Sequence, residues 1–350
     1  FTTNTDAFNV AVGKSAGGAV TTGKENTLLG GLAGDALTDA DHNVAIGFQA
    51  LSTDTLGSRS VAIGYNALVT QNFTTATNGY NTAMGFGAGE TVTTGTANTF
   101  VGGLAGDGTD DGTNNTAMGY LALSANCGND NTAIGKASLQ VATGGGNVAV
   151  GKDAGLSLTS GELNTLVGAL AGDALETGNN NVIIGYGSDA HQSNGANQIV
   201  IGHNITAVDN SYFSFGKASN VVSNNFALND EWSRSSDERL KKNVQNTDLG
   251  LDFINDLRTV KYNWKANNEL DSSDTELAHL YKEDPADNDM DTESTMHGFI
   301  AQEVKAALDT AGVSDWGGWL QDQHGVQQLS REMFVIPLVN AVQKLPTQVT

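Results

Sequence analysis

The sequence has very little cysteine, proline or positive charge, and each shortage excludes a class of protein. A single cysteine, Cys127, rules out a disulfide framework and a cysteine-rich metal site. Three prolines in 350 residues exclude a proline-rich linker and a collagen-like chain. The 17 basic and 39 acidic residues leave a net charge of −22. This balance argues against nucleic acid or an anionic membrane surface as a partner, because binding phosphates requires a basic surface.

Long apolar runs and targeting signals are also missing. No stretch of about 18 apolar residues occurs, so we expect no membrane insertion. The first residues, Phe1 to Asn4, lack the basic and apolar segments of a secretory signal. We therefore expect the sequence to start in the middle of a longer protein.

Glycine, in contrast, is abundant and regularly spaced. The 43 glycines are about 12% of the chain, where roughly 7% is usual. Most of the glycines that mark a repeat are 16 or 17 residues apart, with one spacing of 21 and a last spacing of 14. These column glycines are Gly13, Gly30, Gly47, Gly64, Gly85, Gly102, Gly119, Gly135, Gly151, Gly168, Gly185, Gly202 and Gly216.

The residues before each column glycine follow a fixed pattern. The residue one before it is apolar in all thirteen copies, the residue three before it is Val, Thr or Ile in twelve, and the residue four before it is Asn in ten. Because side chains alternate along a strand, positions −3 and −1 share one face, and we expect them to point into the core while position −2 faces a second tight contact. The stacked Asn side chains are expected to bond the backbone of the neighbouring coils.

These features predict a β-solenoid of 16–17-residue coils. At about 3.3 Å per residue, such a coil holds only two or three short strands and their corners. It is too thin to bury much of its own surface, so stacking, and contacts with other chains, must complete the core.

A longer period is superimposed on the 16–17-residue repeat. The segment 26–35 (NTLLGGLAGD) returns at 98–107 and at 164–173, four coils apart each time. The motif resembles the head repeats of trimeric autotransporter adhesins, in which such units build a β-roll in each of three chains. The resemblance covers roughly residues 7–205 and implies a homotrimer.

The repeats themselves offer no defensible chemistry. Asp107, Asp110 and Asp111 are weak candidates for calcium ligands, but a solvated acidic loop is the preferred explanation, so we predict no metal and no cofactor. A glycosidase needs a cleft with surfaces for stacking sugars, and the shaft has few aromatics to build one. We expect three variable stretches to project from the shaft, namely 52–59, 69–80 and 107–114.

The composition changes abruptly near Ser236. Residues 1–235 contain 7 basic and 19 acidic residues, whereas the much shorter segment 236–350 contains 10 and 20. We therefore expect a solenoid shaft over 1–205, an aromatic-containing neck or cap over 206–235, and a third domain over 236–350.

The third domain has the pattern of an α+β fold. We expect a helix around Leu251–Leu257, a strand at 260–264, an acidic projecting loop at 267–293, a helix over 299–311 that stops at Gly312, and a final helix from 329 to 345 with Ser330 as its cap and a kink at Pro337.

Four motifs in this domain occur in a recognisable order. They are Ser-Asp-x-Arg-Leu-Lys at 236–241, Gly-Leu-Asp-Phe-Ile-Asn-x-Leu-Arg at 250–258, Tyr262-x-Trp264, and His-Gly-Phe-Ile-Ala-Gln-Glu-Val at 297–304. Together they resemble the endosialidase-type intramolecular chaperone domain over nearly all of 236–350. Members of that family lie at the C-termini of bacteriophage tail fibres and tailspikes, promote trimer assembly and then cut themselves off.

The resemblance also implies a site. The scissile bond would be Ser235–Ser236, with Ser236 as nucleophile and Lys241 as base, and Asp237 and Arg239 as supporting residues. A serine hydroxyl needs a base to take its proton, and Ser-Lys pairs are a known arrangement. The lysine must be neutral to act, which requires burial or a nearby cation. Residues five apart on an ideal helix are separated by about 500° and do not share a face, so the pair needs a non-helical segment or a lysine from a neighbouring chain.

The last motif carries three further polar residues, His297, Gln302 and Glu303. We interpret them as structural or trimer-contact residues at a helix start rather than as catalytic groups.

The resulting hypothesis is a segment of a phage tail fibre or tailspike, located in the virion and extracellular. We expect a homotrimer that contacts a bacterial surface receptor, either a polysaccharide or an outer-surface protein, and other tail proteins upstream. Its only enzymatic activity would be a single-turnover serine autopeptidase. One alternative is a bacterial trimeric surface adhesin, against which we weigh the lack of a membrane anchor in the sequence. Others are a chaperone that stays attached, and a polysaccharide-degrading tailspike whose enzyme domain precedes Phe1.

Overall fold

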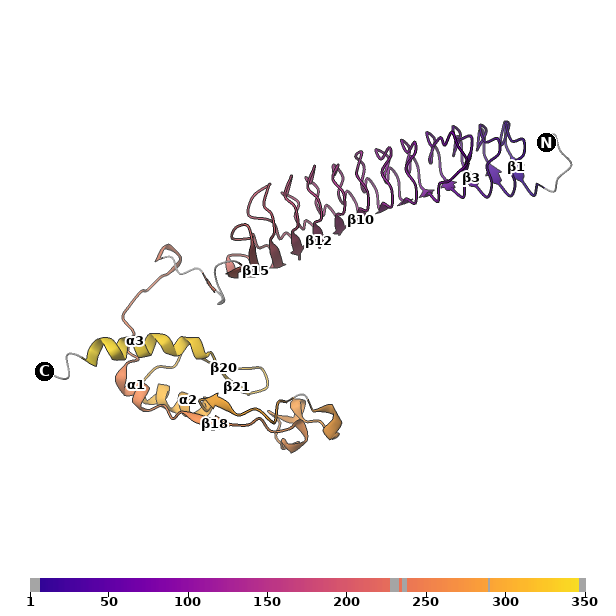
Figure 1. Cartoon of the computed structure of the whole chain (residues 1–350). Helices are drawn as coiled ribbons and strands as arrows, with labels where there is room; N and C mark the ends of the chain where they lie inside the picture. The colour runs from indigo at the N-terminus through magenta and orange to yellow at the C-terminus, as the bar shows by residue number, and fades with distance from the viewer. Residues whose placement is uncertain (1–6, 227–232, 235–237, 289, 346–350) are drawn as a thin grey trace. The chain divides into compact units, whose positions relative to one another are not determined.

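The computed structural model describes residues 7–226, 233–234, 238–288 and 290–345. The chain divides into two compact units, Phe1–Ser236 and Asp237–Thr350 (Figure 1). The first unit is a stack of coils, and the second combines short helices with small sheets.

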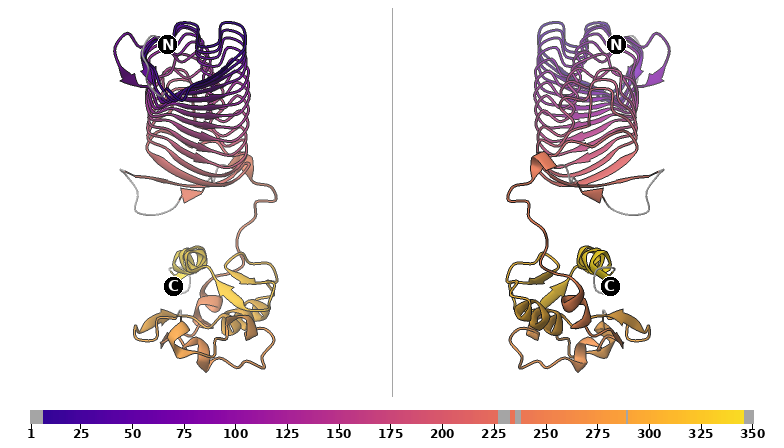
Figure 2. Two further views of the ribbon diagram at one scale, coloured as in Figure 1. Left: turned by 90° about the vertical axis from the view of Figure 1, so that its right-hand side faces the viewer. Right: turned by 90° about the vertical axis from the view of Figure 1, so that its left-hand side faces the viewer.

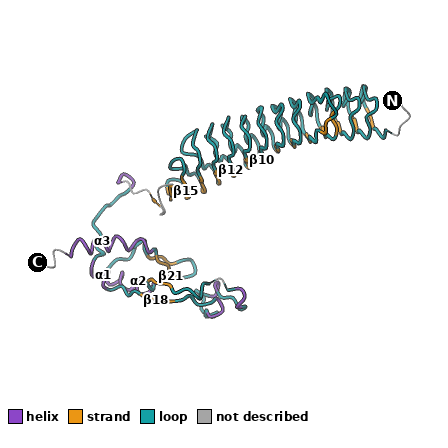
Figure 3. The backbone as a smooth tube through the Cα atoms, in the orientation of Figure 1, coloured by secondary structure: helices purple, strands orange, loops and turns teal. Residues whose placement is uncertain are grey.

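The first unit is a parallel β-solenoid, as the repeat predicts. Each coil contributes one short strand to a single sheet, and most of the remaining backbone is loop (Figure 3). Equivalent residues of consecutive coils pair with each other, as Val44 pairs with Val61. The parallel strands of the coils are β1 (Val10–Val12), β2 (Thr27–Leu29), β3 (Val44–Ile46), β5 (Val61–Ile63), β7 (Thr82–Met84), β8 (Thr99–Val101), β9 (Thr116–Met118), β10 (Thr132–Ile134), β11 (Val148–Val150), β12 (Thr165–Val167), β13 (Val182–Ile184) and β14 (Ile199–His203).

The sheet continues into the segment expected to form a neck. Strand β15 (Tyr212–Lys217) still pairs in parallel with β14. Strand β16 (Asn220–Asn225) then turns back and pairs antiparallel with β15, and β17 (Ser233–Arg234) pairs antiparallel with β16. Because the chain reverses direction at β16, the parallel coil pattern ends there.

The column glycines are required by the stacking of the coils. Gly30 has φ of 143°, and a Cβ at this position would lie 2.4 Å from the carbonyl oxygen of Gly47 in the next coil. The other column glycines from Gly13 to Gly202 meet the next coil in the same way, with a built Cβ between 1.6 and 2.6 Å from a carbonyl oxygen, except Gly168, whose distance is 2.7 Å. Glycine is therefore the residue that permits both the turn and the close approach of the backbones.

Substitution of a column glycine is expected to destabilise the shaft. At Gly102, φ is 139° and a Cβ would lie 2.6 Å from the Gly119 oxygen, so Gly102→Ala should cost at least about 1–3 kcal/mol in backbone strain alone. The matched control is Gly103→Ala, because a Cβ there meets only the Tyr120 ring at 3.6 Å. Thermal melting should show a clear drop for the first variant and almost none for the second. Equal drops would contradict the proposed role of the column.

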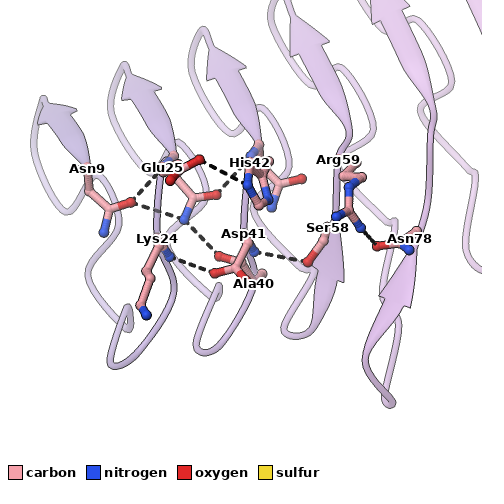
Figure 4. A network of polar contacts seen from close by, with 11 residues as sticks. Asn9, Lys24, Glu25, Ala40, Asp41, His42, Ser58, Arg59 and Asn78 are labelled. Atoms are coloured by element: carbon pink, nitrogen blue, oxygen red, sulfur yellow. Dashed lines mark hydrogen bonds and ion pairs between the residues drawn. The ribbon is translucent and has the colours of Figure 1, made fainter. Parts of the chain in front are cut away.

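The predicted ladder of asparagines is present, and Figure 4 shows its first steps. The Asn9 Oδ1 accepts a hydrogen bond from the Asn26 backbone N–H at 2.8 Å, and the Asn26 Oδ1 accepts one from the Asn43 backbone N–H at 2.9 Å. The Asn26 Nδ2 also donates to the Ala40 carbonyl at 2.7 Å. Each buried amide thus satisfies backbone groups of adjacent coils, which offsets the cost of burying it.

The asparagine ladder is interrupted once, and a side chain of the 21-residue coil between Gly64 and Gly85 bridges the gap. Ser60 occupies the ladder position of one coil, and its short side chain cannot reach as an amide does. The buried Gln71 takes its place: its Nε2 donates to Ser60 Oγ at 3.2 Å and to Asp54 Oδ2 at 2.6 Å, and its Oε1 accepts from Asn81 Nδ2 at 2.8 Å. The role of Gln71 was not predicted, because the equivalent position of several other coils, seven residues after the column glycine, holds an apolar residue such as Leu37, Val92 or Leu158.

The expected projecting stretch at 69–80 is therefore only partly a projection. Gln71 and Phe73 are buried, while 74–76 are exposed. Two extra short strands, β4 (Gly57–Ser58) and β6 (Thr77–Asn78), pair in parallel and form a small lobe beside the main stack (Figure 2).

The expected direction of the strand side chains was wrong. Position −2 is the buried one: Ala45, Ala62 and Phe100 have no exposed surface, whereas Met84 and Met118 at position −1 are 44% and 47% exposed. The coil is so thin that its interior accepts mainly alanine at this position, and the larger residues at −3 and −1 face outward. The core is instead filled by the −2 residues and by alanines and leucines of the other coil segments.

Asp189 is a half-buried carboxylate near the end of the shaft. Burial raises the pKa of Asp189 to about 6, and the nearby Asp173 carboxylate acts in the same direction, against the hydrogen bonds from the Ala190 and Ala174 backbone N–H groups. In the unfolded chain its pKa is about 3.9. Between these two values the folded state keeps a proton that the unfolded state loses, so the stability of the shaft falls as the pH rises from about 4 to 6.

Asp189→Asn should remove this dependence. We expect the melting temperature of the variant, relative to that of the native sequence, to rise between pH 4 and pH 7, because only the native sequence must ionise a half-buried carboxyl group. Melting curves of both chains across this range provide the measurement. A difference that does not change with pH would show that the carboxyl group carries no ionisation cost.

The second unit contains three α-helices among its described residues, α1 (Leu251–Asn255), α2 (Ala301–Thr310) and α3 (Val335–Lys344). Two antiparallel pairs accompany them: β18 (Val260–Tyr262) with β19 (Met296–Gly298), and β20 (Trp319–Gln321) with β21 (Gln327–Leu329). The short 3-10 helices are η1 (Glu238–Leu240), η2 (Asn267–Glu269), η3 (Ala278–Leu280), η4 (Pro285–Asp287) and η5 (Arg331–Phe334).

An aromatic cluster forms the core of this unit. Phe334 stacks on Phe299 with ring centroids 4.8 Å apart and meets Trp316 edge-on at the same distance. Phe253 from α1 joins the cluster, and Val304 and Leu308 from α2 are buried against it. The helical spacing that predicted α2 thus marks its buried face, and the helix ends before Gly312, which has φ of 71°.

The final helix differs from its expectation in two details. Leu329 belongs to β21, and Ser330 makes no side-chain cap. Pro337 lies in the first turn of α3, where a missing N–H removes no helical hydrogen bond, so α3 needs no kink there. Within the part of the chain that the structure describes, no helix combines the length and apolar character needed to cross a membrane.

Candidate functional site

The predicted cleavage segment spans the boundary in sequence between the two units. Ser235, Ser236 and Asp237 lie outside the described residues, so the pairing of Ser236 with Lys241 stays a prediction. The described part begins with the single 3-10 turn η1, after which the Lys241 backbone N–H donates to the Glu238 carbonyl at 2.9 Å. Lys241 therefore follows a short turn and not an α-helix.

The basic residues of this segment are accessible in the single chain. Arg239, Lys241 and Lys242 are all exposed, and the backbone continues past them without regular structure to α1. A lysine in such a position meets solvent unless another surface covers it.

The motif at 297–304 divides between strand β19 and helix α2. His297 lies in β19 opposite Lys261 of β18, with its side chain exposed. Glu303 lies in the first turn of α2, where a carboxylate is favoured by the helix dipole. Gln302 lies beside it and is exposed.

Glu303 ties α2 to the segment that follows α1. Both carboxylate oxygens accept hydrogen bonds from Arg258, one of them from Nε at 3.0 Å and the other from Nη2. The hydrogen bonds from Arg258 lower the pKa of Glu303, and Glu303 in turn raises the pKa of Arg258. This bidentate contact gives Glu303 a structural role, and no local sequence pattern pairs it with Arg258.

Two of the four motifs meet at one groove. The cavity has a volume of about 580 Å³. Its lining includes Tyr262 and Trp264 from one motif and Phe299 and Gln302 from another, together with Leu329 and Arg331. The Arg331 Nη2 donates to the Tyr262 hydroxyl at 3.4 Å. The structure thus brings the aromatic motif and the α2 motif to one surface, whereas His297 is absent from this lining.

Helix α3 exposes an unusual amount of apolar surface. Val335, Ile336 and Val342 are 55–57% exposed, and Leu338 and Val339 are about half exposed. Only Pro337 and Ala341 of this helix are buried. A helix that is apolar on most of its circumference is normally covered by another surface.

The weak calcium candidates in the shaft do not form a cluster. Asp107 accepts a hydrogen bond from Ser124 Oγ, and Asp110 accepts one from Thr93 Oγ1, while Asp111 is exposed. Burial raises the pKa of Asp107. Across the described ranges, no group of three His, Cys, Asp or Glu side chains is placed to hold a metal ion.

The two units together define a β-solenoid rod followed by a small α+β domain with an exposed lysine-rich entry segment. Comparison with protein families adds a specific identity for the second unit: the model of Peptidase_S74, the chaperone of endosialidase, matches residues 236–313. The chain thus carries an endosialidase-type chaperone domain after its solenoid. Comparisons with curated proteins and with solved structures gave no match.

Proposed function

We propose that this chain is part of a bacteriophage tail fibre or tailspike, in which the solenoid forms a trimeric rod for attachment to the host surface. The chaperone domain would assemble the trimer and then be released by cleavage between Ser235 and Ser236. The observation that carries the proposal is the chaperone-family match at 236–313, directly after a repetitive solenoid.

The cleavage chemistry follows from the position of the nucleophile. Ser236 Oγ attacks the carbonyl carbon of Ser235, and Lys241 takes the hydroxyl proton and passes it to the departing amide nitrogen. The C–N bond breaks and an ester forms between the two residues. Water then hydrolyses the ester, which leaves a carboxylate on Ser235 and a free amine on Ser236.

The neutral state that Lys241 needs has a simple source in a trimer. Lys241 is exposed in the single chain, and a base of this kind must be desolvated or placed near another cation. A neighbouring chain that covers the segment would remove water from it and bring the Arg239 and Lys242 side chains of the entry segment closer. Cleavage would then follow assembly, because the site is complete only in the trimer.

The outward face of the strands supports the homotrimer. Positions −3 and −1 from β1 to β14 carry no charged residue, although the chain has 39 acidic residues. The coil strands are mostly three residues long, so the face that contains them is about 10 Å wide and about 55 Å long, on the order of 550 Å². Flanking residues would have to contribute to reach the roughly 800 Å² per partner of a standard interface. Two further copies of the same chain, placed around an axis parallel to the rod, would cover this face.

A chaperone is useful to such a rod because its repeats are nearly identical. Two chains can pair one coil out of step at little cost in contacts. A folded C-terminal domain that associates first would set the register. Its later removal would trap the trimer kinetically, because the element that lowered the folding barrier has gone.

The test compares the 350-residue chain with its Ser236→Ala variant by denatured and native mass. We expect the native sequence to yield fragments that end at Ser235 and begin at Ser236, and the variant to stay whole with a native mass of three chains. An uncut trimer of the native sequence would support the attached-chaperone alternative and remove the peptidase. A monomer would contradict the proposed assembly.

A further inference from the structure

The asparagine ladder ends near the last coils of the shaft, at a contact with a histidine ring. Gln198 occupies the ladder position there, is fully buried, and its backbone N–H donates to the Asn181 Oδ1 at 3.0 Å. The Gln198 Nε2 lies 2.7 Å from the Nδ1 of His191, whose side chain is only 12% exposed. The other ring nitrogen, Nε2, lies 3.4 Å from the Asp209 carboxylate. The last step of the ladder therefore includes a titratable group.

Backbone donors fix the orientations of the two amides beside this ring. The His191 backbone N–H donates to the Gln198 Oε1 at 3.3 Å, and the Ala196 backbone N–H donates to the Asn210 Oδ1 at 2.7 Å. Exchanging oxygen and nitrogen in either amide would set an NH2 group against a backbone N–H, donor against donor. The Gln198 Nε2, which also donates to the Asn210 Oδ1 at 3.1 Å, is therefore the atom that faces the ring.

This orientation determines which ring nitrogen carries the proton. An amide nitrogen is a donor only, so the His191 Nδ1 must accept the hydrogen bond from Gln198 with its lone pair. The proton of the neutral imidazole then lies on Nε2, the nitrogen that faces the Asp209 carboxylate. The neutral ring is thus compatible with its neighbours on both sides.

The charges around the ring favour the opposite state. Residues 153–216 contain six acidic residues and no lysine or arginine. The acidic residues of this coil and of the segments that adjoin it are Asp173, Glu176, Asp189 and Asp209. The other imidazole of this region, His203, stacks on Tyr186 instead. Carboxylates attract an imidazolium, but the second ring proton would occupy Nδ1 and oppose the NH2 group of Gln198.

We propose that His191 is a pH-dependent latch at the end of the shaft. In the neutral state its bare Nδ1 holds Gln198, and Gln198 together with Asn210 joins this coil to the turn that precedes β15. A second proton, taken from the solvent, removes the acceptor, so the Gln198 amide must turn away and give up its bond to Asn210. Acid would loosen the end of the shaft, while the coils with asparagine keep their ladder. The latch belongs to the single chain and does not depend on the number of chains in the rod.

Asp189, the other titratable group of this coil, acts in the opposite direction. Its ionisation lowers stability as the pH rises from about 4 to 6, so acid stabilises the shaft through Asp189. Protonation of His191 instead removes a hydrogen bond and opens the coil in acid. The direction of the change therefore shows which of the two groups is responsible.

Nitrogen NMR of the full chain, labelled with 15N-histidine, tests the tautomer. At pH 8 the ring shifts of His191 should show a bare Nδ1 and a protonated Nε2. The spectrum of His191→Asn identifies these signals, because they are missing from it. A proton on Nδ1 at pH 8 would overturn the assigned tautomer and the latch with it.

Hydrogen exchange of the full chain tests the opening. Between pH 7.5 and pH 5, the protection factor of the backbone amides in 196–211 should fall at least about tenfold, because two opposed donors leave a buried group without its partner. The matched control is His191→Asn, whose side-chain oxygen can accept from Gln198 near the position of Nδ1 but does not titrate. This variant should keep its protection at pH 5.

Equal losses in both chains, or no loss in either, would overturn the latch. The amides of β9 serve as an internal reference, because a loss of protection there as well would mean that the whole rod opens. If His191→Asn fails to fold, this reference still decides within the native sequence. A loss confined to 196–211 supports the latch, and a loss along the whole rod contradicts it.

Discussion

Lys241→Ala is expected to assemble normally and remain uncut. If Lys241 takes the proton of Ser236, its removal leaves the hydroxyl group without a base, and cleavage should slow by at least about 100-fold, the lower end of the usual contribution of a general base. Because Lys241 is exposed in the single chain, the substitution should not disturb the core of the chaperone domain. The fraction of cut chain, followed over time on a denaturing gel, measures the effect.

Lys242→Ala is the matched control for this experiment. It removes the same charge one residue further along, and that side chain is equally exposed. We expect the control to be cut at nearly the native rate. If both variants are cut normally, Lys241 is not the base. If both variants stay uncut, cleavage depends on the total positive charge of the segment and not on the Lys241 amine alone.

Met118→Glu is expected to convert the trimer into single chains. Met118 is at position −1 of its coil, 47% exposed in the single chain, and lies on the face that we propose to be covered by other copies. Three carboxylates brought together in that apolar interface would have no countercharge, and burying an unpaired charge costs several kcal/mol each. Native mass spectrometry or light scattering should show a shift from three chains towards one.

Val141→Glu provides the comparison on another part of the coil surface. Val141 is also apolar and 41% exposed, but it lies outside the strand face. A rod that stays trimeric with this substitution shows that a new charge by itself is tolerated. Loss of the trimer in both variants, or in neither, would argue against the strand face as the interface.

The sequence was sufficient to predict the solenoid because its signals repeat. At Gly30 only glycine permits the close contact with the backbone of the next coil. At Asn26 an amide is needed because it forms hydrogen bonds with backbone groups of adjacent coils. Both requirements recur along the solenoid. The direction of the side chains was less accessible, because alternation alone does not say which face is inside. Alanine at −2 in seven of the thirteen copies was the available signal, since a narrow interior favours a small residue there.

The chaperone domain could be predicted as a sequence of motifs but not as a surface. The order of the motifs gave no indication that Tyr262 and Gln302 line one groove, or that Arg258 holds both oxygens of Glu303. Contacts of this kind join residues 40 or more positions apart, and no local pattern encodes them. The exposure of α3 could not be predicted either, because the sequence pattern of an apolar helix is the same whether its own chain or another chain covers it.

The coil-to-coil hydrogen bonds also determine how the rod responds to tension. Bonds such as that from Thr27 N–H to the Asn43 carbonyl, 2.8 Å long, join one coil to the next along the axis. A force applied to the two ends of a chain therefore acts on all coil-to-coil contacts in series. The weakest of these contacts breaks first. Lateral contacts between chains act in parallel and share that load. The mechanical strength of such a rod would thus depend on the contacts between its chains and much less on the single solenoid.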